Sequence, residues 1–258
     1  MSYNCDEEVF GQPNFYSCMD AYAQMPPGKY ARSYGDRGNR QPYDFPLPLR
    51  YASGKWQLVE DSESMAQTDD VPGDGTCIIE VFPIVEGFSD LMKPLDLKMA
   101  VQKLIQDCVA GDNPKGGIAE RMGQADRLSV FVARIEPNSV RCFYAAGSPP
   151  VTALCPFGLN RMPVSDENQI FGQRGTPNID VALPVRYADS LSECAIDVVI
   201  DGPPARANWY DIWGSAVMVV AMCARFGMSG SASTSDGGTI LAVRVTNDAP
   251  ATLSGAAA

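Results

Sequence analysis

The sequence predicts an α+β protein made of two tandem domains, each with the element order βαββαβ. Three observations lead to this prediction: repeated unusual residues, a duplicated set of four cysteines, and strand and helix periodicities that recur in the same order. A constant offset of 137 positions relates Cys5 to Cys142 and Cys18 to Cys155. We therefore expect a first domain over 1–137, a second over 138–250 and a flexible tail over 251–258.

The first repeat has four stretches of alternating apolar residues and two stretches of helical periodicity. The predicted strands cover 3–7, 45–51, 76–83 and 127–135, and the predicted helices cover 14–25 and 95–109. Its connections are longer than those of the second repeat. The connection 60–74 carries acidic residues and no basic residue, which predicts a solvated, disordered loop.

The second repeat follows the same order with shorter connections. The predicted strands cover 140–145, 181–187, 194–201 and 239–247, and the predicted helices cover 154–161 and 209–223. The Gly- and Ser-rich stretch 228–238 lacks the Gly-Lys-Ser/Thr sequence of a phosphate-binding loop and follows a helix instead of a strand. We expect it to be a flexible connector.

Right-handed crossovers in a βαββαβ unit predict a ferredoxin-like arrangement, with two helices on one face of a four-stranded antiparallel sheet of order 4-1-3-2. In that arrangement the end of the second helix lies near the start of the third strand. This proximity predicts one disulfide between the third strand and the second helix of each repeat, and the remaining cysteines would then join the first strand to the first helix. Pairing of the first and third strands is an open alternative. The favoured pairs are Cys77 with Cys108, Cys194 with Cys223, Cys5 with Cys18, and Cys142 with Cys155.

Composition limits the possible functions. The chain has a net charge of -11, which disfavours nucleic acid and anionic membranes as partners because both would repel it. The chain contains no histidine, which excludes Ser-His-Asp, Cys-His and HExxH chemistry. No residue set marks a catalytic, metal or cofactor site, so we expect a non-enzymatic protein without cofactor or metal.

The cysteines indicate the compartment. Eight cysteines in two matching sets of four, without any CxxC pair, favour structural disulfides over zinc or thioredoxin chemistry. The alternative is a set of reduced thiols buried in the core. No apolar run is long enough to span a membrane, so we expect no transmembrane segment. Together these features predict a secreted, extracellular protein.

Strand alternation places a polar trio on the sheet face away from the helices in each repeat. The interpretations are a cross-strand ion-pair ladder or a site for an anion or carboxylate. A further hypothesis is that the two sheets pack against each other through these faces, because apolar residues that include Val130 and Val132 flank the trio of the first repeat. The trios are Arg186, Asp197 and Arg244 in the second repeat, and Arg50, Glu80 and Arg134 in the first.

The Tyr/Phe-Gly-x-Arg-Gly loops at 34–38 and 171–175 form the most specific repeated loop feature. Arg37 and Arg174 in these loops could bind a carboxylate or a ligand. The alternative is that each loop is tied back to its own domain, because residues kept in both copies tend to serve the fold.

The tandem units resemble fungal secreted cysteine-containing proteins with a KP6 killer toxin-like fold. The resemblance rests on the Cys-(12 residues)-Cys spacing and on the Met-Pro, Phe-Gly-x-Arg and Leu-Pro-x-Arg-Tyr motifs, and it covers both halves. It implies a fungal effector or killer toxin-like factor whose partner is a host or competitor protein or a cell-wall glycan. It supplies no catalytic residues. The alternatives are a carbohydrate or cell-wall binding protein and a carboxylate-dependent hydrolase.

Overall fold

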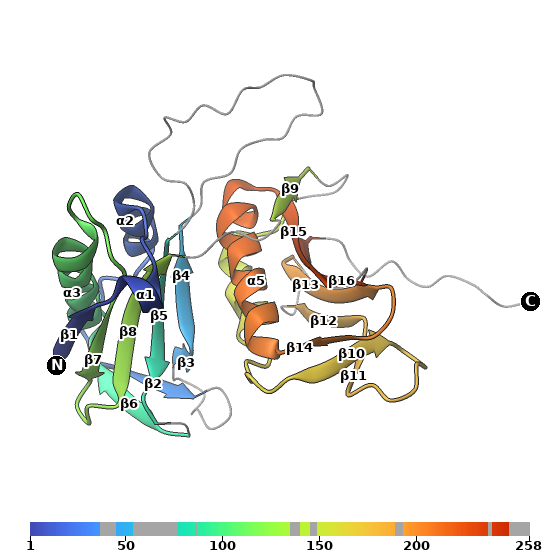
Figure 1. Ribbon diagram of the computed structural model, residues 1–258, viewed down its shortest axis with the longest axis horizontal. Helices are drawn as coiled ribbons and strands as arrows, with labels where there is room; N and C mark the ends of the chain where they lie inside the picture. Colours follow the sequence, from blue (N-terminus) through green and yellow to red (C-terminus); the bar gives the residue numbers. More distant parts are fainter. Residues whose placement is uncertain are drawn as a thin grey trace, which may run out of the picture. The chain divides into compact units, whose positions relative to one another are not determined.

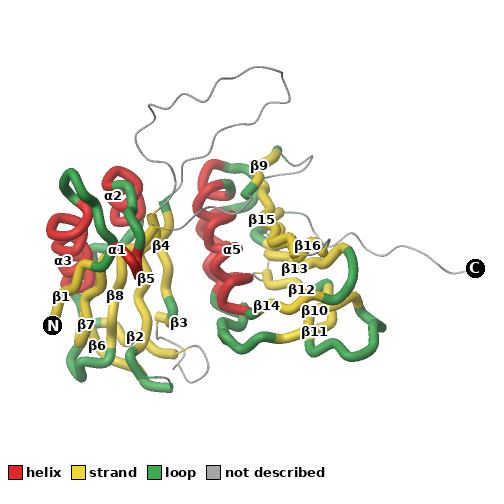
Figure 2. The backbone as a smooth tube through the Cα atoms, in the orientation of Figure 1, coloured by secondary structure: helices red, strands yellow, loops and turns green. Residues whose placement is uncertain are grey.

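The computed structural model describes residues 1–36, 45–53, 77–85, 87–134, 140–144, 149–188, 193–236 and 239–247. The chain divides into two units, Met1–Pro137 and Asn138–Ala258. Both are α+β units with mainly antiparallel sheets and few helices (Figures 1 and 2). The acidic stretch 60–74 and the tail 251–258 lie outside the described residues.

The first unit contains a five-stranded antiparallel sheet and a smaller three-stranded sheet. The large sheet has the order β1 (Ser2–Cys5), β7 (Gly117–Met122), β8 (Leu128–Arg134), β5 (Cys77–Pro83), β4 (Leu49–Ala52). Helices α2 (Phe15–Ala23) and α3 (Pro94–Leu104) pack on one face of this sheet, and a π-helical turn (Ile105–Val109) continues α3 (Figure 1). The small sheet has the order β3 (Phe45–Leu47), β2 (Arg32–Asp36), β6 (Ser89–Met92), and α1 spans Glu7–Phe10.

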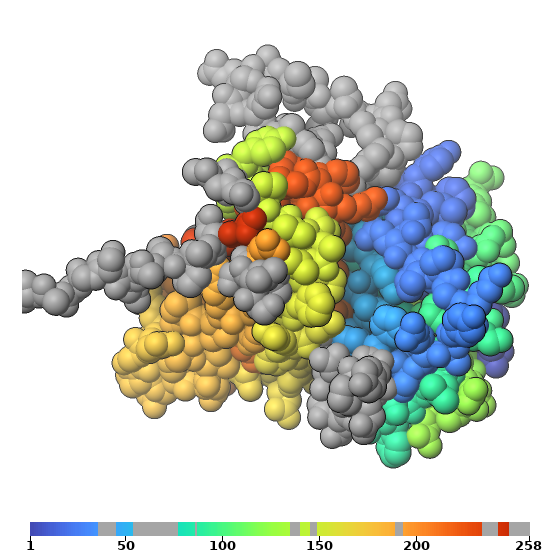
Figure 3. Space-filling view, turned by 180° about the vertical axis from the view of Figure 1, so that it is seen from behind, coloured from blue at the N-terminus to red at the C-terminus, as the bar shows by residue number. Residues whose placement is uncertain are grey.

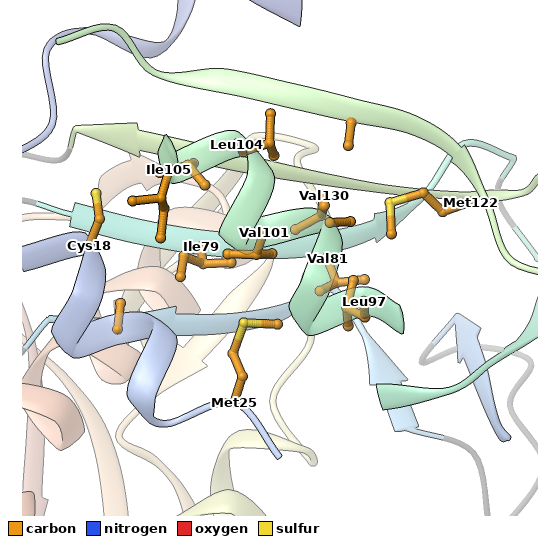
Figure 4. Packing of buried hydrophobic residues seen from close by; sticks show 14 of the residues in the cluster. Cys18, Met25, Ile79, Val81, Leu97, Val101, Leu104, Ile105, Met122 and Val130 are labelled. Carbon is orange, nitrogen blue, oxygen red and sulfur yellow. The ribbon is translucent and has the colours of Figure 1, made fainter. Parts of the chain in front are cut away.

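The core of the first unit lies between the two helices and the large sheet (Figure 4). Leu97, Val101 and Leu104 recur along one side of α3 and are buried. They belong to one cluster with Ile79 and Val81 of β5. Burial of each such aliphatic side chain contributes about 1.5–3 kcal/mol relative to exposure, so this face of the helix accounts for the position of α3.

The second unit repeats this layout strand by strand. Its large sheet has the order β9 (Arg141–Phe143), β15 (Ser229–Asp236), β16 (Thr239–Thr246), β13 (Ala195–Asp201), β12 (Val185–Ala188). The small sheet has the order β11 (Val181–Leu183), β10 (Gln169–Gln173), β14 (Ala205–Ala207). Helices α4 (Cys155–Leu159) and α5 (Trp209–Met222) correspond to α2 and α3, and 3-10 turns cover Thr152–Leu154 and Ala224–Phe226.

The predicted strand order 4-1-3-2 is wrong in both units, and the sheets have five strands instead of four. A strand that was not predicted, β7 or β15, follows the long helix and forms a hairpin with the next strand. Strands joined by a short turn pair with each other readily. The hairpin therefore separates the first strand from the rest of the sheet and places it at the edge.

The stretch 228–238 is not the flexible connector that was predicted, because 229–236 form β15. Its small residues are explained by close packing against the helix. A Cβ atom on Gly230 would lie 2.5 Å from the Cys223 sulfur, and one on Gly117 in β7 would lie 2.8 Å from the Cys108 sulfur. Glycine makes room at both positions for the disulfide that crosses the strand.

All eight cysteines form disulfides, but the predicted pairing is wrong. In both units the first cysteine pairs with the fourth and the second with the third. Because β1 and β9 lie beside the strand that follows the long helix, their cysteines meet the end of that helix. The bonds are Cys5–Cys108, Cys18–Cys77, Cys142–Cys223 and Cys155–Cys194.

Candidate functional site: an arginine row on the second sheet

A row of polar side chains crosses all five strands of the second large sheet. The register pairs Arg186 of β12 with Asp197 of β13, and Asp197 with Arg244 of β16. It continues from Arg244 to Ser231 of β15, and from Ser231 to Arg141 of β9. Directly opposed residues on antiparallel strands point to the same face. We call these five residues the arginine row.

The arginine row lies on the face away from α5. Gly230, the neighbour of Ser231 in β15, points towards Cys223 at the end of that helix. Since successive side chains alternate across a strand, Ser231 and the rest of the row point the other way. The sequence placed Arg186, Asp197 and Arg244 on this face, and the register confirms that they share it.

Sequence reasoning missed Arg141 and Ser231. Arg141 could have been found only by pairing β9 with β15, and β15 was not predicted. Both Arg141 and Arg244 are exposed. β9 lies at the surface of the second unit in the space-filling view (Figure 3).

The one acid of the row is loosely held. Arg186 Nη1 lies 3.6 Å from Asp197 Oδ2, and the two side chains are 28% and 23% exposed. Burial raises the pKa of Asp197, while Arg186 and Arg244 act to lower it. The arginines therefore do not fully offset the loss of water around this carboxylate.

The equivalent row of the first unit is different. Cross-strand partners run from Arg50 to Glu80, Phe131, Ile118 and Asn4. Arg50 Nε lies 2.6 Å from Glu80 Oε2, with both side chains at least 95% buried. This row has one closed ion pair, and its position equivalent to Arg244 is the aromatic residue Phe131.

Arg134 does not join Glu80, as the sequence had predicted. The register places Arg134 opposite Cys77, whose side chain faces the helices, whereas Phe131 lies opposite Glu80. The prediction is wrong because it matched the last strand of the first repeat to that of the second with a shift of three residues. The residue that corresponds to Arg244 is Phe131, not Arg134. Val130 and Val132 also belong to the helix-side core and not to the open face.

The Gly-x-Arg-Gly loop of the second unit is held through its backbone. The Arg174 N–H donates to the Leu183 carbonyl over 3.1 Å, and Gly175 has a φ of +92° that favours glycine. The Arg174 side chain is exposed. The structure does not bring it into the arginine row, and Arg37 lies outside the described residues.

The Leu-Pro-x-Arg-Tyr motif has a structural role in both units. It carries the chain from the small sheet into the large sheet through a cis peptide at Leu47-Pro48 and at Leu183-Pro184. Its tyrosines, Tyr51 and Tyr187, have raised pKa values because they are buried. These phenols stay protonated at neutral pH, which fits a packing role.

A shallow hollow between β1 and α3 is lined in part by Tyr3, Met99 and Lys103. Lys103 forms an ion pair with Asp107 and lies 5.3 Å from the centre of the Tyr3 ring. These contacts engage the Lys103 ammonium group. Among the described residues, no group of three His, Cys, Asp or Glu side chains could hold a metal ion.

Asp197→Asn is expected to leave the protein as stable as the parent at pH 7, or more stable by at most about 1 kcal/mol. When folding raises the pKa of a carboxyl group, as for Asp197, the folded protein loses stability as the pH rises from the unfolded to the folded pKa of that group. The amide removes that loss, so the two proteins should converge near about pH 3. Melting curves at both pH values measure this.

Asp201→Asn is the matched control, because Asp201 lies on the same strand and is exposed. It should give no pH-dependent difference of this kind. A clear loss of stability in Asp197→Asn at pH 7 would show that attraction to the arginines outweighs burial.

No described helix is long and apolar enough to cross a membrane. Comparison with protein families gives no match, and no curated protein and no solved structure matches the chain.

Proposed function

We propose that the protein is a secreted, non-enzymatic factor that acts by binding through its surface, in the manner of a fungal effector or killer toxin-like protein. The observation that carries this proposal is the set of four disulfides, placed alike in the two units. Disulfides form and persist in oxidising compartments and are rare where thiols are kept reduced. Secretion accounts for eight paired cysteines most simply.

The tandem arrangement supports an origin by duplication. The two units share strand order, the order of their helices and disulfide pattern. Residues kept in both units are those that the fold requires: the cysteines, the glycine beneath the Cys5–Cys108 or Cys142–Cys223 bond, and the Leu-Pro-x-Arg-Tyr motif. The KP6 killer toxin-like resemblance rests in part on two of these features, the cysteine spacing and the Leu-Pro-x-Arg-Tyr motif, so it speaks for the scaffold and the compartment.

A second candidate function is carbohydrate or cell-wall binding. The observation that favours it is the arginine row, which is exposed at Arg141 and Arg244 and has no counterpart of the same charge in the first unit. Surface features that differ between otherwise matching units are suited to binding, because the shared fold does not require them.

Thiol titration tests the secreted assignment. The protein, unfolded in denaturant without reductant, should show no free thiol, and the same sample after reduction should show eight. Peptide mapping should recover the four pairs described above. Eight free thiols in protein recovered from its natural setting without reductant would contradict secretion.

A further inference from the structure

The residues of the arginine row determine its charge, and the strand register determines the approximate spacing of its arginines. Three arginines against one aspartate give it a net charge of +2, although the whole chain carries -11. Directly opposed residues on neighbouring strands lie about 5 Å apart. Because one strand lies between consecutive arginines, two inter-strand spacings separate them and their Cα atoms are about 10 Å apart along one line.

The neighbours of the row on its face are mostly small residues. Ala195 and Ala242, which flank it on the same face, are small and buried, and the adjacent Ser233 is also small. Phe143 lies two residues after Arg141 in β9, on the same face, and is 42% exposed. The face thus combines spaced cations with one accessible aromatic ring at its edge.

We propose that the arginine row binds an extended, carboxylated polysaccharide, with Arg141, Arg186 and Arg244 donating hydrogen bonds to carboxylates along one chain. This inference rests on the proposed binding role and specifies its ligand. A guanidinium group donates two parallel hydrogen bonds to a carboxylate, which suits it to this class of anion. Phe143 provides an apolar surface for a sugar ring.

Charge density distinguishes this ligand from nucleic acid. A nucleic acid strand carries a phosphate about every 3.4 Å, whereas the row offers a cation about every 10 Å. Asp197 lies between Arg186 and Arg244 and repels any polymer that places anions at every step. The acidic remainder of the chain adds to that repulsion. A polymer with a carboxylate only on every second sugar can place its anions on the arginines and keep them away from Asp197, and its lower charge density weakens the general repulsion.

The first unit provides an internal comparison. At the positions equivalent to Arg244, Ser231 and Arg141 it has Phe131, Ile118 and Asn4, and its one arginine in the row is closed against Glu80. Binding therefore belongs to the second sheet.

The test is calorimetric titration of the full chain with sodium hyaluronate, which carries a carboxylate only on every second sugar, and with neutral dextran and single-stranded DNA. Hyaluronate should bind at low salt and more weakly at high salt, since exposed charge pairs are screened. Dextran should not bind. Absence of hyaluronate binding, or equally strong binding of dextran or of the DNA, would overturn the proposal.

Variants locate the interaction. Arg141→Gln/Arg244→Gln should weaken hyaluronate binding about a hundredfold, about tenfold for each guanidinium group. Arg174→Gln/Arg206→Gln makes the same change of charge at two exposed arginines in or beside β10 and β14 and should change binding less than about twofold. Equal losses in the two double variants would show diffuse attraction and overturn the site.

Asp197→Asn supplies a result of opposite sign. It removes the only anion of the row and should tighten binding severalfold, which a merely misfolded variant could not do. Unchanged or weaker binding would contradict the assigned role of Asp197. Failure of all binding in a protein without free thiols would overturn this inference alone, whereas free thiols would contradict the secreted role.

Discussion

Glu80→Ala is expected to lower the free energy of unfolding by about 3–5 kcal/mol, because it removes one partner of a buried ion pair. Arg50 Nε lies 2.6 Å from Glu80 Oε2, and the side chains are 5% and 2% exposed. Removal of the carboxylate leaves a guanidinium group without its closest anion in an environment of low polarity. Denaturant unfolding followed by fluorescence measures the loss.

The second unit provides a matched control at the equivalent position. Asp197→Ala removes the acid of a partly exposed pair whose atoms are 3.6 Å apart, and should cost less than about 1 kcal/mol. Arg50→Met/Glu80→Leu, which removes both charges, should recover much of the stability lost in Glu80→Ala. Similar losses for Glu80→Ala and Asp197→Ala would show that burial does not set the strength of these pairs.

Removal of the Cys5–Cys108 disulfide is expected to cost nearly 5 kcal/mol. The bond closes a sequence separation of 103 residues, and the chain-entropy estimate for a loop of about 100 residues is about 4.7 kcal/mol. The Cys155–Cys194 bond closes a separation of 39, for which the same estimate is about 4 kcal/mol. Unfolding of Cys5→Ala/Cys108→Ala and of Cys155→Ala/Cys194→Ala compares the two.

The same variants test the pairing itself. Cys5→Ala/Cys108→Ala should retain three disulfides and no free thiol. The control Cys5→Ala/Cys18→Ala should expose two free thiols, at Cys77 and Cys108, because it breaks two different bonds. If that control showed no free thiol, the pairing first expected from the sequence would be right and the pairing described here wrong.

The elements with long periodic patterns could be predicted from the sequence. Helix α5 was predicted over 209–223 and spans Trp209–Met222, because its apolar spacing is regular and Gly227 ends the helical region that follows it. The mixed α+β class follows from the same patterns. The duplicated cysteines likewise predict disulfide bonds, because that prediction depends only on the number and the sequence context of the cysteines.

The sheet order could not be predicted in the same way, because it depends on β7 and β15. β15 is rich in small residues, and Gly117 in β7 and Gly230 in β15 reduce the strand signal where a disulfide packs on the strand. Their common signal is a glycine placed shortly after the last cysteine of each repeat. Because these two strands were not predicted, the sequence analysis assigned the wrong neighbouring strand to the first strand and the wrong disulfide partner to its cysteine.

The candidate site was predicted in part. Alternation along single strands is enough to group Arg186, Asp197 and Arg244 on one face. It cannot determine register between strands, so Arg134 was grouped with Glu80 although it faces the helices. Arg141 depends on the pairing of β9 with β15, which no local pattern in the sequence reveals.

The disulfides at β1 and β9 also affect the edges of the sheets. Both strands are short, and an edge strand presents unpaired backbone groups that can recruit another chain. Cys5 and Cys142 attach these strands covalently to the ends of the long helices. Detachment of either strand would expose β7 or β15 as a new and longer edge. Reducing conditions should therefore favour association between chains through these strands, whereas the oxidised protein is protected from it.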